Sequence, residues 1–312
     1  MFGKYESLLD ADLRAFIEES NAAFPSQLMS LPLHVQRSAY DAMCRIFRAM
    51  PEGGLETGET FIHTDGGPLA LRSYVPTDRK AKTVLLYFHG GGFVFGSLES
   101  HDDICADLCV DAGVEVISVD YRLAPEHRHP AAHDDAVAAW NWISAQERRP
   151  IVLIGESAGA GLAAALSHAT RSKGVRPAAQ ILIYPSLGGH GKETSFTTHS
   201  NAPLLSAADV EHYRSIRYRC AEDADEPYVN PLRDNNFANL PPTWLFAAEF
   251  DPLSGEAETY GANIRRFGGT ARCEVEGGLV HGYLRARRRV ARAAAAFDRI
   301  IKAVRLAGGG TA

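Results

Sequence analysis

The spacing of hydrophobic and polar residues changes along the chain. Up to about residue 50, apolar residues recur at helical intervals, first at Leu9, Leu13 and Phe16 and again at Met43 to Phe47. We therefore predict two helices, broken around Pro25 and Pro32. From about residue 59, apolar and polar residues alternate with the spacing that is typical of strands. Residues 61–63 and 69–74 predict two strands joined by a turn at residues 65–68.

Short and nearly continuous apolar runs follow, separated by stretches with helical periodicity. Runs that are apolar throughout indicate strands buried on both faces, and the helical stretches between them indicate a parallel sheet with helices on both sides. The predicted strands are 83–88, 114–119, 151–154, 179–184, 243–248 and 271–275, and the predicted helices are 104–112, 131–144, 158–171, 255–267 and 286–304.

One segment interrupts this alternation. Residues 188–224 contain a loop and a helical pattern near 207–218, but no further strand. We predict that this segment and residues 1–50 form a helical cap over one edge of the sheet. The expected organisation is an N-terminal cap segment at 1–50 and an α/β domain at 51–312, with 188–224 contributing to the cap.

Composition and charge exclude several classes of protein. The 312 residues are 46% hydrophobic and 22% charged with a net charge of −6, which is typical of a globular protein and unfavourable for nucleic-acid binding. No apolar stretch reaches the roughly 18 residues of a membrane span, so no membrane insertion is expected. The five cysteines are scattered and contain no CxxC pair, which suits the cytoplasm.

A candidate nucleophile follows the strand predicted at 151–154. Residues 155–159 read GESAG, a G-x-S-x-G pattern that leads directly into a helical stretch. A sharp turn from strand to helix requires small residues beside its centre, and it would project Ser157 above the sheet at the start of the helix. Such a pattern is weak evidence alone, but its place between strand and helix strengthens it considerably.

A serine nucleophile needs a base, and the base needs an acid that orients it. In the α/β-hydrolase arrangement the three follow in the order serine, acid, histidine. Of the twelve histidines, only His281 lies beyond the strand at 243–248 and its trailing Asp251. We predict Asp251 as the acid, with Glu249 and Glu256 as reserve candidates. Asp251 as a simple helix cap remains an open alternative.

The chemistry also needs donors for a developing oxyanion. The strand at 83–88 runs into His89, Gly90, Gly91 and Gly92, where three glycines expose the backbone N–H groups. Together with the N–H of Ala158, these can form an oxyanion hole of the kind described for H-G-G-G motifs.

With these motifs in place, the chain resembles the hormone-sensitive-lipase-like family of α/β-hydrolases, the bacterial carboxylesterases. The motifs that carry the resemblance are HGGGFVFG at 89–96, DYRLAPEH at 120–127, GESAG at 155–159, DPL at 251–253 and HGY at 281–283, in the family's order and approximate spacing. The match covers about residues 60–305. Two positions depart from the family: Glu156 stands where an aspartate is usual, and Ala160 where a second glycine is usual.

The resemblance implies an α/β-hydrolase fold with a mostly parallel central sheet and a helical cap. It further implies Ser157 as nucleophile, Asp251 as acid and His281 as base, with the N–H groups of Gly91, Gly92 and Ala158 in the oxyanion hole. The implied activity is hydrolysis of small-molecule carboxylic esters of short to medium acyl chain, without metal or other cofactor, and the implied assembly is a homodimer formed at an edge strand. Four further residues are predicted to line the substrate pocket: Phe93, Phe95, Tyr184 and Leu204.

Two other functions stay open. An amidase or lactonase could use the same triad, because the acyl-enzyme chemistry is shared. A small-molecule receptor on the same fold would have lost the catalytic histidine, and the presence of His281 argues against this alternative.

Three other patterns favour structural roles. Residues 159–164 fit G-x-G-x-x-A, but Tyr184 and Pro185 occupy the region where dinucleotide binding needs an acidic residue. The histidines and aspartates between 127 and 135 match no zinc spacing. The arginines between 285 and 292 are predicted to lie on the outer face of the last helix.

Overall fold

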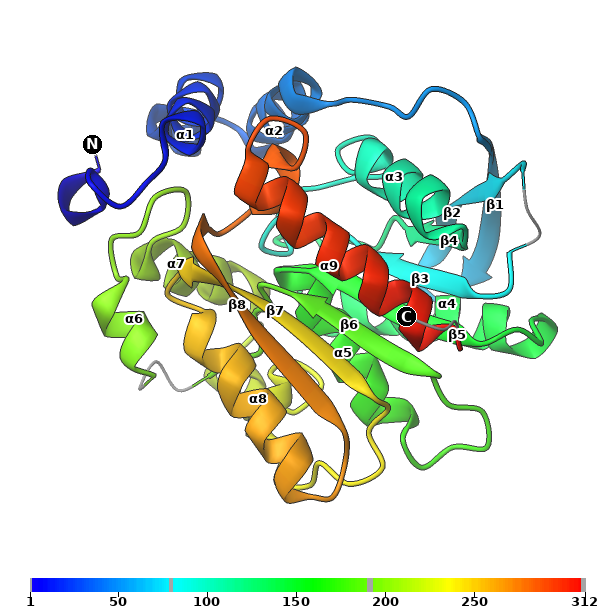
Figure 1. The fold of residues 1–312 in the computed structure, drawn as a ribbon. Coiled ribbons are helices and arrows are strands. Elements are labelled where there is room, and N and C mark those ends of the chain that lie inside the picture. Colours follow the sequence, from blue (N-terminus) through cyan, green and yellow to red (C-terminus); the bar gives the residue numbers. More distant parts are fainter. Residues whose placement is uncertain (1, 79–80, 190–192, 310–312) are drawn as a thin grey trace.

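The computed structural model describes residues 2–78, 81–189 and 193–309, and eight strands in these ranges form a single sheet (Figure 1). The strand order is β1-β2-β4-β3-β5-β6-β7-β8. β1 and β2 are antiparallel to their neighbours, and the remaining pairs are parallel. The strands are β1 (Leu55–Thr64), β2 (Gly67–Pro76), β3 (Val84–Phe88), β4 (Glu115–Val119), β5 (Ile151–Glu156), β6 (Ala179–Ile183), β7 (Thr243–Phe250) and β8 (Ala271–Val280).

Helices cover both faces of the sheet, which confirms the predicted α/β architecture. α3 and α9 pack on one face, and α4, α5 and α8 pack on the other. Successive side chains of β3 point to opposite faces, so Leu85 and Tyr87 join one hydrophobic cluster while Leu86 and Phe88 join the second. These helices are α3 (Asp102–Ala112), α4 (Ala131–Gln146), α5 (Ala158–Thr170), α8 (Ser254–Arg266) and α9 (Ala291–Ala307).

The remaining helices come from the two segments predicted to form a cap. In Figure 1, α7 lies beside the arrowhead of β7, and α1 and α2 lie beyond the same edge of the sheet. A hydrogen bond of 3.0 Å between Tyr5 Oη and His199 Nδ1 joins the two segments. Residues 190–192 of the predicted cap lie outside the described residues. The helices are α1 (Ala11–Ala23), α2 (Leu33–Phe47), α6 (Thr194–Thr198) and α7 (Ala207–Arg217), with 3₁₀ turns at Gly3–Tyr5, Ser26–Ser30, Ala221–Asp225, Pro231–Arg233 and Tyr283–Ala286.

Three predicted boundaries are wrong by five or six residues, and one of them is the start of β1, which lies at Leu55 rather than at residue 61. β8 does not end at residue 275 but continues through Gly277 and Gly278 to Val280, because it stays paired with β7 across a register shift near Ala248. The last helix begins at Ala291 rather than at residue 286, since residues 283–286 form a separate 3₁₀ turn.

The prediction that the arginines at 285–292 lie on the outer face of the last helix is wrong for Arg285 and Arg287. Arg288, Arg289 and Arg292 are exposed as predicted, although only Arg292 lies on α9. Arg287 is buried and its guanidinium lies 2.6 Å from Asp103 and 2.7 Å from Asp107. Both aspartates lie on the buried helix α3, where a carboxylate must find a charged partner. The basic run therefore docks the C-terminal segment onto α3.

None of the described helices is long and apolar enough to cross a membrane.

Candidate active site

Ser157 occupies a strained turn between β5 and α5. Its backbone has φ 54° and ψ −120°, which L residues rarely adopt. The flanking glycines make this turn possible: a Cβ at Gly159 would lie 2.0 Å from the carbonyl oxygen of Phe88, and one at Gly155 would lie 2.5 Å from the backbone of Gly159. The turn holds Ser157 at the positive end of the α5 dipole.

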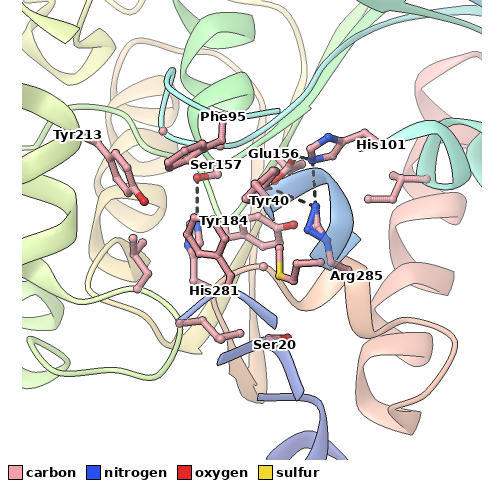
Figure 2. Close-up of a pocket in the computed structure, with 18 of the residues that line it drawn as sticks. Ser20, Tyr40, Phe95, His101, Glu156, Ser157, Tyr184, Tyr213, His281 and Arg285 are labelled. Atoms are coloured by element: carbon pink, nitrogen blue, oxygen red, sulfur yellow. Dashed lines mark hydrogen bonds and ion pairs between the residues drawn. The ribbon is translucent and has the colours of Figure 1, made fainter. Parts of the chain in front are cut away.

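Ser157 lies within hydrogen-bond distance of His281, which in turn lies against Asp251. His281 Nε2 is 2.8 Å from Ser157 Oγ, and His281 Nδ1 is 2.7 Å from Asp251 Oδ2 (the first of these contacts is drawn in Figure 2). Asp251 is fully buried, and its other oxygen accepts the Leu253 N–H at 2.8 Å. Because a carboxylate only accepts, the Nδ1 of His281 carries the proton, and Nε2 is free to accept from the serine hydroxyl.

The strand ends explain how three residues distant in sequence meet. Ser157 follows β5, Asp251 follows β7 and His281 follows β8 directly. Parallel strands present their carboxyl ends at one edge of the sheet, so these side chains converge there. The extension of β8 to Val280 carries His281 to this edge without an intervening loop.

The two reserve carboxylates point elsewhere. Glu249 is exposed and accepts the N–H of Gly278 at 2.6 Å. Glu256 is buried, accepts three backbone N–H groups of residues 187–189 and pairs with Arg214 at 2.8 Å. Burial raises the pKa of Glu256. Neither glutamate has a recorded contact with His281.

The glycine loop after β3 leaves its backbone donors available. Gly91 and Gly92 have φ values of 117° and 64°, and a Cβ at Gly91 would lie 2.3 Å from the Phe95 carbonyl oxygen. In the described part of the chain, the N–H groups of Gly91, Gly92 and Ala158 donate to no recorded acceptor. A developing negative charge beside Ser157 can therefore use them.

The carboxylate of Glu156, next to Ser157 in the chain, is buried, and the sequence predicted no partner for it. Glu156 accepts a hydrogen bond from the Gly90 N–H, and its Oε1 lies 2.9 Å from His101 Nε2. Burial by itself would raise the pKa of Glu156, but the contact with His101, the positive charge of Arg285 and the Gly90 N–H hold that pKa below its ordinary value. The glutamate that departs from the family pattern thus anchors the glycine loop to the turn at Ser157.

A cavity of about 230 Å³ opens beside Ser157 and His281 (Figure 2). Three predicted pocket residues line it, namely Phe95, Tyr184 and Leu204, whereas Phe93 lines a smaller adjoining cavity that also contacts Ser157 and Ala158. Other lining residues, which the sequence did not predict, come from α1 and its C-terminal cap, from α2 and α7, and from the segment after His281. They include Phe16, Phe24, Tyr40, Met43, Tyr213 and Arg285.

Helical periodicity was the only signal for most of these missed residues. It identified the inward faces of α1 and α2 but not what those faces cover, since an apolar stripe packs equally well on a core or over a cavity.

Among the described residues, no group of three or more histidine, cysteine, aspartate or glutamate side chains could hold a metal ion. His129 and Asp135 instead contact Glu226 and Arg122.

Comparisons with known proteins identify the family and the relatives of this chain. The family model for the alpha/beta hydrolase fold matches residues 85–285. The chain is 32% identical to the carboxylic ester hydrolase LipN of Mycobacterium tuberculosis over 84% of this chain and 74% of that protein. It is 32% identical to an ethyl acetate hydrolase of Pseudomonas putida over 89% and 92% of the two chains.

Solved structures match along nearly the whole length. A hyperthermophilic esterase from the archaeon Pyrobaculum calidifontis superposes with a TM-score of 0.86 at 30% identity, covering 95% of this chain and 97% of its own. The similarity therefore includes the segments that surround the cavity as well as the sheet.

Proposed function

The chain belongs to the alpha/beta hydrolase fold family, in its hormone-sensitive-lipase-like branch, and we propose that it is a carboxylesterase of the serine hydrolase type. The observation that carries this proposal is the hydrogen-bonded series Ser157–His281–Asp251 beside three available N–H groups. The names of its relatives, which include an ethyl acetate hydrolase and carboxylic ester hydrolases, support ester substrates.

The proposed mechanism begins at the serine hydroxyl. Ser157 Oγ attacks the ester carbonyl carbon while His281 Nε2 takes the hydroxyl proton, and Asp251 stabilises the imidazolium that results. The carbonyl oxygen gains negative charge, which the N–H groups of Gly91, Gly92 and Ala158 stabilise. His281 then gives its proton to the leaving alcohol, and the acyl group remains on Ser157.

The second half of the reaction repeats these roles with water. His281 takes a proton from a water molecule, whose oxygen attacks the acyl carbon. When the tetrahedral intermediate collapses, the carboxylic acid leaves and Ser157 regains its proton from His281. No metal or organic cofactor is proposed for either half.

We propose substrates with short to medium acyl chains. The cavity of about 230 Å³ is small beside ligand pockets, which typically run to ~300–1,000 Å³. Residues 1–50 and 188–224 are proposed to act as the cap that limits it, since Phe24, Tyr40 and Tyr213 line the cavity from these segments. An amide or lactone substrate remains the second candidate, because it would use the same acyl-enzyme chemistry.

Hydrolysis of a p-nitrophenyl ester series from acetate to palmitate tests the proposal. We expect the rate to be highest for short esters and to fall with chain length. Ser157→Ala should lower the rate at least about a thousand-fold, because it removes the nucleophile. Ser215→Ala, which removes an exposed hydroxyl on α7, is the matched control.

A native protein that cleaves none of these esters in a Ser157-dependent way would overturn the esterase assignment. Amides and lactones assayed in the same way would then test the second candidate. Binding of ligand without turnover would instead favour the receptor alternative.

The location and the assembly are also proposals. We propose a cytoplasmic location, because no disulfide joins the five cysteines, all of which the structure describes.

We propose a homodimer formed at β8, which in the described part of the chain pairs only with β7 and so leaves one edge open. Light scattering during size-exclusion chromatography measures the assembly directly.

A further inference from the structure

Arg285 brings a positive charge into the cavity beside Ser157. It lies on the 3₁₀ turn Tyr283–Ala286, four residues after His281, and lines the same cavity as Ser157 and His281. Figure 2 shows Arg285 with His101 and Glu156 on one side of Ser157, opposite Tyr213. Much of the remaining lining is aromatic or aliphatic, and Arg285 and Glu156 are the charged side chains among the described lining residues.

The guanidinium of Arg285 finds few hydrogen-bond acceptors in the protein. Its recorded hydrogen-bond contacts, to Tyr40 Oη and to His101 Nε2, both involve Nη2 at 3.5 Å. His101 Nε2 also lies 2.9 Å from Glu156, and an imidazole nitrogen that donates to this carboxylate cannot accept from Arg285. Among the described residues, Nε and Nη1 have no recorded partner.

Arg285 also lacks the ion pair that each neighbouring arginine makes. No carboxylate of the described residues lies within 4 Å of its guanidinium, and Glu156 is already engaged by His101 and the Gly90 N–H. The other arginines of the run all contact carboxylates: Arg287 with Asp103 and Asp107, Arg288 with Asp107, Arg289 with Glu19, and Arg292 with Asp10.

An arginine that lines a largely apolar cavity and has no carboxylate within 4 Å of its guanidinium keeps strong donors for a ligand, although the charge of the more distant Glu156 acts on it. A guanidinium in such surroundings binds a carboxylate with charge-assisted hydrogen bonds, which are roughly twice as strong as neutral ones. The Tyr40 hydroxyl has no recorded acceptor in the described chain, so its proton can serve the same ligand oxygen.

We propose that Arg285 binds a carboxylate of the substrate, so that the preferred ester carries a free carboxylate at the end of the group that fills this cavity. The inference rests on the proposed esterase function and narrows its substrate class. The carboxylate could belong to the acyl group, as in the monoester of a dicarboxylic acid, or to the alcohol, as in an acylated hydroxy acid.

The test compares charged esters with neutral esters of the same length. The acyl arm pairs monomethyl adipate with methyl hexanoate, and the alcohol arm pairs 4-acetoxybutanoate with butyl acetate. A pH-stat gives kcat/KM for each ester with the native protein, Arg285→Met and Arg292→Met. Arg292→Met removes the same charge from an exposed arginine outside the cavity and is the matched control.

We expect Arg285→Met to lower the ratio of kcat/KM for the charged ester to that for its neutral partner at least tenfold in one arm. The arm that responds identifies which side of the ester carries the carboxylate. The ratio should stay at the native value in Arg292→Met and be partly restored in Arg285→Lys. Titration of Ser157 with a phosphonate and a thermal unfolding curve establish that each variant is folded.

An unchanged ratio in both arms, with native activity on the neutral esters, would overturn this inference alone. The same holds if the native protein rejects both charged esters and Arg285→Met accepts them. A native protein that cleaves neither kind of ester would overturn the esterase assignment, and the inference with it.

Discussion

At the scale of single residues, backbone strain gathers around the candidate site. Five non-glycine residues among those described have positive φ, and four of them border the two cavities at Ser157: Phe93, Ser157, Tyr184 and Leu204. Such conformations cost about 1–3 kcal/mol each and persist only where the surrounding structure imposes them. Since the predicted site residues include all four, the strain and the proposed chemistry coincide.

The two carboxylates at the end of β7 allow a matched test of the proposed acid. Asp251→Asn keeps the shape of the side chain but removes the charge that stabilises an imidazolium at His281. We expect kcat on a short p-nitrophenyl ester to fall roughly 10³–10⁴-fold. Glu249→Gln makes the same chemical change on an exposed side chain and should alter kcat less than twofold. Equal losses in both variants would contradict the assignment of Asp251.

At the scale of elements, a buried carboxylate joins α7, in the second segment proposed to form the cap, to α8. Glu256, near the start of α8, accepts the N–H groups of Leu187, Gly188 and Gly189, and Arg214 of α7 pairs with it. A carboxylate buried this deeply costs several kcal/mol unless a cation compensates it. The pair therefore helps to hold α7 against α8 and the loop at 187–189.

We expect Arg214→Met to lower the free energy of unfolding by about 3 kcal/mol or more, because it leaves the Glu256 charge buried without its partner. Urea unfolding followed by circular dichroism measures this change. Glu211→Gln removes the exposed partner of the same arginine and should cost only ~0.5 kcal/mol. A small loss in Arg214→Met would show that α7 is held chiefly by its apolar contacts.

At the scale of the whole molecule, one buried and one half-buried histidine link stability to pH. Burial lowers the pKa of His133, on α4, to about 4, and burial together with His101 lowers the pKa of His89 to about 3. His133 Nδ1 and His89 Nε2 are buried without a hydrogen-bond partner among the described residues. Below pH 6.5 the unfolded chain binds protons at these histidines that the folded chain does not, so their contribution to stability is present above pH 6.5 and is lost as the pH falls.

His133→Gln should weaken this dependence. Each pH unit between 6.5 and the folded pKa costs ~1.4 kcal/mol per histidine, so the native protein should lose about 2 kcal/mol more than the variant between pH 6.5 and pH 4.5. Urea unfolding at both pH values measures the difference, with His212→Gln as the control for loss of an exposed imidazole. Native and His133→Gln stabilities that fall in parallel would show that His133 does not contribute.

Much of this molecule could be predicted from its sequence. Apolar runs such as 84–88 and 151–154 are buried on both faces, so their composition alone indicates strands of a covered parallel sheet. The order of Ser157, Asp251 and His281 along the chain selected three residues that the structure joins, since His281 lies 2.8 Å from Ser157 and 2.7 Å from Asp251. Local periodicity and chain order suffice here because strand ends in such a sheet share one edge.

The tertiary structure alone decided what surrounds these residues. The pairing of β8 with β7 carried the strand through Gly277 and Gly278, where composition favoured a loop. The arginines from 285 to 292 read as one exposed basic patch, yet Arg287 is buried against α3 while Arg285 faces the cavity. The direction of a side chain depends on which elements pack against it, and that packing joins residues too distant in sequence for any local pattern to record.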